Sequence, residues 1–129
     1  MKHIQTYRIH ESTLSPINNL MSAYTKVTEP IENIGTIYDV KVLAVDRNRI
    51  SHKYPQWKSY IGSHHWGKGT SYIPEDSIWI AQGLSQEEFV RVVNHELIER
   101  KAMQDLQSQG MTPGESWNIA HPTIKTMGF

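Results

Sequence analysis

The sequence predicts an α+β fold in which a small mixed or antiparallel sheet is packed by one long helix and two shorter helices. Residues 36–45 are rich in β-branched and aromatic side chains, which is typical of a strand. Residues 85–109 combine a helix start signal with apolar residues at helical spacing. The expected order is therefore strand, helix, strands, long helix and short helix, which is an α+β layout.

The first half of the chain is expected to supply a strand, a helix and the central strand. Residues 3–9 alternate loosely between apolar and polar side chains and favour a short strand. Ser15 and Pro16 are typical of the N-cap and first position of a helix. The pair Glu29-Pro30 should end that helix, because the residue before a proline avoids the helical conformation. Residues 36–45 then form the clearest central strand.

The middle of the chain is less regular. Residues 46–69 are expected to form a long loop, and a loop of that length in a compact domain is usually functional or mobile. Residues 70–73 and 77–81 should form two short strands around a Pro-Glu-Asp turn.

The last third of the chain is expected to be helical. Ser85 and Glu88 form a capping box that opens the longest helix, and Gly110 closes it. Pro113 should begin a shorter helix that reaches about residue 120 and is interrupted by Pro122.

Composition narrows the class of protein. The 129 residues include 13 basic and 13 acidic side chains that are scattered along the chain, so no nucleic-acid partner is expected. The N-terminus lacks the apolar segment of a signal peptide, and no apolar run is long enough to span a membrane. We therefore expect a cytoplasmic protein with no membrane partner. No repeat or linker divides the chain, so residues 1–129 should form a single domain.

The long helix carries the strongest functional signal. On a helical wheel, His95 and Glu99 lie one turn apart on a stripe shared with Val92, Ala102 and Leu106. A solvated ion pair would normally have charged neighbours, so this stripe is expected to be partly buried. A buried imidazole and carboxylate need a partner, and residues at this spacing can reach one divalent cation. The chain has seven histidines and no cysteine, so imidazole is its softest available metal ligand.

The segment His95-Glu96-Leu97-Ile98-Glu99, after the strand-like SIWIAQGLS, resembles the core of a zincin metallopeptidase. The resemblance covers residues 70–121 and departs from the usual His-Glu-x-x-His motif, because Glu99 stands where the second histidine belongs. His121 would then be the third ligand, giving the two-histidine, one-carboxylate composition of thermolysin-type sites. The resemblance implies a zincin-like architecture, a zinc-bound water and peptide hydrolysis. Glu96, which the wheel places near the rim of the site, would be the catalytic general base.

Other candidates surround this motif, and each has a simpler interpretation. His95 and Glu99 could form only a helical side-chain pair, worth about 0.3 kcal/mol. Glu115 is either solvated or orients His121 by accepting a hydrogen bond from its ring. The run His64-His65-Trp66 is either a substrate-contacting loop or ordinary loop polarity, and adjacent strand residues face opposite ways, so at most one of the two histidines should reach a given site.

Three functional hypotheses follow. The first is a metal-dependent hydrolase, with zinc as the expected ion and a peptide or protein as substrate. The second is a non-catalytic module that binds a partner protein through the aromatic loop 52–66, with a structural metal, another divalent ion or none. The third, an iron oxygenase, is weaker because its two histidines and one carboxylate usually lie on barrel strands.

Overall fold

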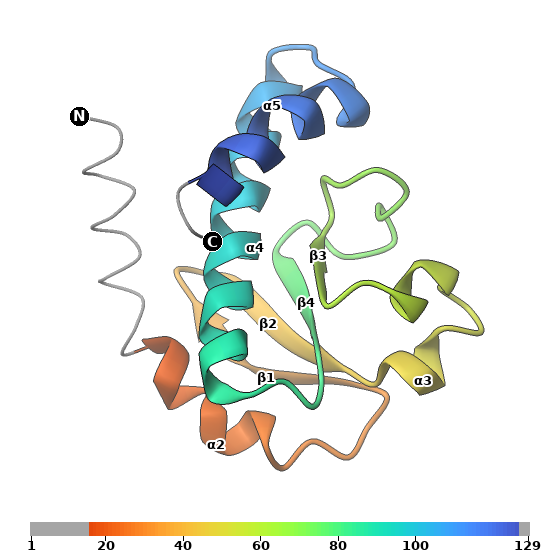
Figure 1. Ribbon diagram of the computed structural model, residues 1–129, viewed down its shortest axis with the longest axis vertical. Helices are drawn as coiled ribbons and strands as arrows, with labels where there is room; N and C mark the ends of the chain where they lie inside the picture. Colours follow the sequence, from red (N-terminus) through yellow and green to blue (C-terminus); the bar gives the residue numbers. More distant parts are fainter. Residues whose placement is uncertain (1–15, 127–129) are drawn as a thin grey trace.

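The computed structural model describes residues 16–126, which form a four-stranded mixed sheet covered by helices (Figure 1). The strand order is β1-β2-β4-β3. Strands β1 (Ile31–Ile37) and β2 (Val40–Val45) are antiparallel, β2 and β4 (Ser77–Ala81) are parallel, and β4 and β3 (Gly62–His64) are antiparallel. The predicted α+β class with a small mixed sheet is confirmed. The strand expected at residues 3–9 and the cap at Ser15 lie outside the described residues.

The predicted single strand at residues 36–45 is wrong, because the chain turns back within it. Tyr38 and Asp39 both have positive φ, 49° and 64°, and they connect β1 to β2 as a two-residue hairpin turn. Positive φ at both positions matches the right-handed twist of the flanking strands. β-Branched residues continue on both sides of this turn, so composition alone reads as one uninterrupted strand.

The first described helices are shorter than predicted. Residues 16–19 are helical, and α2 (Met21–Tyr24) ends well before Pro30. The Tyr24 hydroxyl donates a hydrogen bond to the carbonyl of Ala81 and accepts one from the Leu84 N–H. These two bonds attach the end of α2 to the segment that leads into α4, so tertiary contacts fix where the helix stops.

The predicted long loop at residues 46–69 contains three short elements, with turns and irregular chain between and after them. Asp46 caps α3 (Arg47–Ile50), the 3₁₀ helix η1 (Pro55–Lys58) follows, and β3 comes last. The strand expected at residues 70–73 is absent from the structure, where these residues form turns. The Ile73 N–H donates to the Thr70 carbonyl and the Ile73 side chain is fully buried, so its apolar character serves the core.

The long helix α4 (Gln86–Ser108) begins as predicted, with Ser85 and Glu88 forming a capping box, and Gly110 follows its end at φ +100°. Its Phe89 and Val93 are buried against the sheet, while Val90 and Leu97 pack on the same core. Asn94 is also buried, with its side-chain amide donating to the carbonyl of Val90.

Helix α5 (Pro113–Thr126) continues through Pro122, so the predicted stop near residue 120 is wrong. Pro122 and Asn118, whose carbonyl would have accepted the missing N–H, are both exposed, and water can replace the lost bond at low cost. Helices α4 and α5 lie side by side (Figure 1). Met103 on α4 and Ala120 and Ile124 on α5 form one buried cluster between them. No described helix is long and apolar enough to cross a membrane.

Candidate metal centre

Three side chains from α4 and α5 converge where the sequence predicted a site. Glu99 Oε2 lies 3.0 Å from His95 Nε2 and 2.7 Å from His121 Nδ1. Glu99 is 5% exposed, and the ligand atoms of all three residues lie within 4.8 Å of one another. The continuation of α5 through Pro122 places His121 inside a regular helix that packs on α4.

His64 joins this cluster from the sheet. It is paired with Ile78 across β3 and β4, so it points to the same face as Ile78, toward α4. Its Nε2 lies 3.0 Å from Glu99 Oε1, and its Nδ1 accepts a hydrogen bond from the Trp66 N–H at 3.1 Å. Because Nδ1 accepts, the ring proton of a neutral imidazole is on Nε2, and His64 donates to Glu99.

The two oxygens of Glu99 therefore face different partners. Oε1 accepts from His64, while Oε2 lies between His95 and His121. Burial raises the pKa of the Glu99 carboxyl, but hydrogen bonds from the three imidazoles outweigh that effect and hold the pKa well below its ordinary value. Glu99 is accordingly an anion at neutral pH, as a metal ligand must be.

The donor set fits a divalent cation such as zinc. Two imidazole nitrogens and one carboxylate oxygen are common zinc ligands, and they leave a fourth position open. At metal–ligand distances of about 2.0–2.1 Å, tetrahedral geometry separates neighbouring donor atoms by about 3.3 Å. The separations of 2.7 and 3.0 Å from Glu99 Oε2 need to widen only slightly. A cation would replace the N–H protons that now lie between these atoms.

Glu96, which was predicted near the rim of the site, lies beside the centre and is buried. It is 6% exposed, and one of its carboxylate oxygens lies within 4.8 Å of ligand atoms of His64 and Glu99. Burial raises the pKa of the Glu96 carboxyl well above its ordinary value; the nearby Glu99 charge adds to the rise and His95 opposes it. A cation on Glu99 would lower that pKa, because opposite charge favours the ionised carboxylate.

Gly62 provides the space that Glu96 occupies. It is paired with Ile80 in the sheet and so faces α4, like His64. A Cβ at Gly62 would lie 2.7 Å from Val92 Cγ1 and 2.9 Å from Glu96 Cγ, closer than side chains normally approach. Glycine at this position therefore allows α4 to lie close to β3.

The remaining sequence candidates lie away from the centre. His65 Nδ1 bonds the Ile73 carbonyl at 2.7 Å, so of the two adjacent histidines only His64 reaches the site. Trp66 packs beside the cluster that joins α4 and α5. Glu115 was a candidate to orient His121, but its carboxylate accepts from the Thr112 N–H at the start of α5. The carboxylate bonded to His121 is that of Glu99.

The sequence reasoning missed Trp117, whose ring stacks on His121 with centroids 4.4 Å apart and planes inclined by 12°. The two residues are four apart on α5, a spacing that would have indicated the contact. Trp117 is 41% exposed, so it covers one side of the His121 ring and leaves its own outer face open to solvent.

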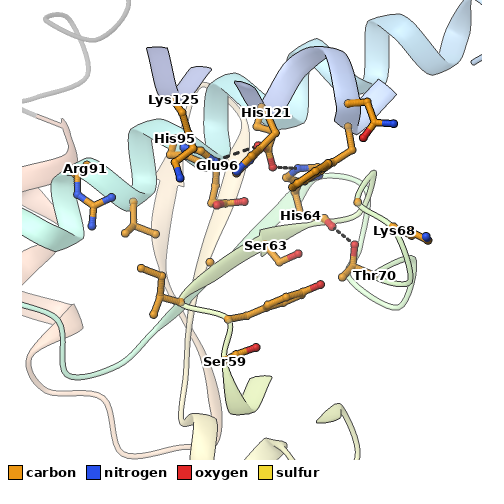
Figure 2. A pocket seen from close by; sticks show the side chains of 18 of the residues that line it. Ser59, Ser63, His64, Lys68, Thr70, Arg91, His95, Glu96, His121 and Lys125 are labelled. Carbon is orange, nitrogen blue, oxygen red and sulfur yellow. Dashed lines mark hydrogen bonds and ion pairs between the residues drawn. The ribbon is translucent and has the colours of Figure 1, made fainter. Parts of the chain in front are cut away.

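The residues of the centre and Trp117 line a cavity of about 650 Å³ between α4, α5 and the segment that contains β3. Figure 2 shows His95 and Glu96 on α4 and His121 on α5 beside the cavity, with His64 next to them on β3. Such a cavity is large enough for a small ligand or a few residues of a peptide. Comparison of the chain with protein-family models, curated proteins and solved structures gave no match.

Proposed function

We propose that the chain is a metal-dependent hydrolase that binds zinc through His95, Glu99 and His121 and acts on peptides. The observation that carries the proposal is the convergence of His95 Nε2, Glu99 Oε2 and His121 Nδ1 at the floor of a cavity. A surface ion pair would explain neither the burial of Glu99 nor the arrival of the third donor from a different helix.

The proposal includes a zincin-like architecture. The motif His95-Glu96-Leu97-Ile98-Glu99 lies on a long helix that follows β4 and packs on the sheet, which is where the resemblance expects it. The motif's second histidine is replaced by Glu99, and His121 on α5 supplies the second imidazole. The composition of the ligand set is retained although two positions are exchanged.

Glu96 and His64 have different roles in this chemistry. A bound zinc ion supplies Lewis acidity that activates a water and polarises the carbonyl of the substrate. Glu96 accepts the proton of the attacking water and returns it to the leaving amine, which its position beside Glu99 allows. His64 fixes the orientation of Glu99 by donating a hydrogen bond to Glu99 Oε1.

Metal analysis and peptide hydrolysis test the proposal together. Protein purified without chelator should contain one zinc per chain, and His95→Ala or His121→Ala should lose it. Glu96→Gln should keep the metal and lose hydrolysis of a mixed peptide library by at least about 100-fold. Glu87→Gln, which changes an exposed glutamate on the first turn of α4, is the matched control and should keep both. Metal-free wild-type protein would refute the proposal.

One observation favours a non-catalytic binding module as a second candidate. The three imidazoles satisfy Glu99 without any ion, so the cluster could be purely structural. The loop 52–66 is not the exposed aromatic surface that this hypothesis first assumed, because Trp57 is fully buried. The exposed apolar side chains near the cavity are Trp117 and Ile119 on α5. Bound metal with no hydrolysis by wild type or Glu96→Gln would favour this candidate.

A further inference from the structure

Three cationic side chains line the cavity, and each comes from a different segment. Lys68 lies in the loop after β3, Arg91 on α4 and Lys125 on α5, and all three are exposed (Figure 2). Within residues 16–126 none of these three cations has an acidic partner; among the other described cations, Lys41, Arg49 and Lys101 have one, and the rest do not. The cavity therefore has unneutralised positive charge at its mouth.

Among residues 16–126, no exposed acidic side chain lines the cavity. Among the described residues that line the cavity, the only carboxylates are Glu96 and Glu99, which are 6% and 5% exposed. Glu99 already accepts from three histidines, and a bound divalent ion would add further positive charge at the floor. The chain as a whole has no net charge, whereas the exposed charged side chains that line this cavity are all cationic.

Two of these cations are each one helical turn away from a proposed metal ligand. Arg91 is one helical turn before His95 on α4, and Lys125 is one turn after His121 on α5. One turn advances a helix by about 5.4 Å, whereas an extended peptide advances by about 3.3 Å per residue. A peptide with its reacting carbonyl above the ligands would therefore place side chains one or two residues away close to these cations.

We propose that the cavity selects acidic peptides, with glutamate or aspartate one or two residues from the reacting bond. This inference rests on the proposed hydrolase function and specifies its substrate class. Arg91 and Lys125 hold the acidic side chains on the two helices, and Lys68 attracts the peptide from the opposite side of the mouth. A charged mouth of this kind increases both the rate of association and the discrimination against basic peptides.

Binding to zinc-loaded Glu96→Gln protein tests the inference without turnover. The probes are fluorescein-labelled nine-residue peptides of alanine and phenylalanine that carry two glutamates, two glutamines or two lysines. We expect the glutamate peptide to bind about fivefold to tenfold more tightly than the glutamine peptide, since each solvated ion pair contributes about 0.2–1 kcal/mol. The preference should decrease as salt is added, because salt screens exposed charges.

Charge-neutralising variants then locate the effect. Arg91→Gln and Lys125→Gln should each reduce the preference for the glutamate peptide about twofold to fivefold. Lys26→Gln removes an exposed cation that does not line the cavity, so it is the matched control and should leave the preference unchanged. Equal binding of the glutamate and glutamine peptides, or an equal loss in Lys26→Gln, would overturn the inference.

Two further outcomes separate this inference from the proposed function. If wild-type enzyme hydrolyses acidic and neutral peptides equally well, the hydrolase stands and the charge selection fails. If acidic peptides bind with the expected preference but no peptide is hydrolysed, the charge selection stands and the hydrolase fails. A labelled single-stranded oligonucleotide that binds more tightly than the glutamate peptide would overturn the assignment to peptides.

Discussion

Zinc should raise the melting temperature of the wild-type protein and have little effect on His121→Ala. His121 is the best ligand to remove, because its side chain is 26% exposed and its main contacts are with Glu99 and Trp117. Alanine at this position also suits the helical conformation of α5. The substitution therefore removes one donor atom while disturbing the core less than a change at buried Glu99 would.

The size of the effect follows from linkage. An ion that binds only the folded chain at 100 times its Kd stabilises that chain by about 2.7 kcal/mol. At about 2.1 cal/mol/K per residue, unfolding the 129 residues carries an entropy of about 0.27 kcal/mol/K. The ratio of the two predicts a rise of about 10 °C. In His121→Ala the same zinc concentration lies near or below the weakened Kd, so the rise should be about 3 °C or less.

Calorimetry with chelator and with buffered zinc measures this difference. His65→Ala is the matched control, because it removes a neighbouring imidazole whose hydrogen bond goes to the Ile73 carbonyl. Its metal-free melting temperature should fall, but the increment from zinc should equal that of the wild type. The reasoning is refuted if zinc leaves the wild type unchanged, or if His121→Ala shows the full increment.

Three other substitutions test individual contacts. His64→Ala should weaken zinc binding about 10-fold to 100-fold in a chelator competition, and His64→Gln, which can still donate to Glu99, should recover part of the loss. Gly62→Ala should cost about 1–3 kcal/mol in urea unfolding, because its Cβ would press on Glu96; an unchanged midpoint would contradict that geometry. Tyr24→Phe should cost about 1–2 kcal/mol at pH 7. Burial raises the pKa of Tyr24 above 10. The stabilisation by the Tyr24 hydroxyl is therefore complete below pH 10, the pKa in the unfolded chain, and is lost as pH rises through the pKa in the folded chain. In that pH range the free energy of unfolding should fall more for the wild type than for Tyr24→Phe.

The parts of the fold that the sequence predicted depend on local chemistry. The capping box of Ser85 and Glu88 and the glycine after α4 act within a few residues, so they can be recognised without tertiary information. The hairpin turn at Tyr38 and Asp39 was missed because it contains none of the glycine or asparagine typical of positive φ. Pro122 led to a predicted helix end that the structure does not have, because its exposed position lets α5 continue.

Some contacts of the candidate site could likewise be predicted from local sequence, whereas others depend on the tertiary structure. The pairing of His95 with Glu99 follows from helical spacing alone, and the expectation that adjacent histidines face opposite ways is confirmed by His64 and His65. The contact between His64 and Glu99 spans 35 residues and depends on the pairing of β3 with β4, which no local pattern indicates. The depth of Glu96 likewise depends on Gly62, a residue with no side-chain signal of its own.

The exchange of a histidine for Glu99 can be judged by the charge of the proposed ligand set. Two neutral imidazoles and one carboxylate leave a divalent ion with a net charge of about +1, whichever positions the ligands occupy. The exchange therefore preserves the electrophilic character of the ion, provided that the carboxylate stays anionic and correctly oriented. In this chain His64 meets both conditions, because its proton is held on Nε2 by the Trp66 N–H and is donated to Glu99 Oε1. That bond leaves the second oxygen, Oε2, facing His95 and His121, the two histidines of the proposed ligand set.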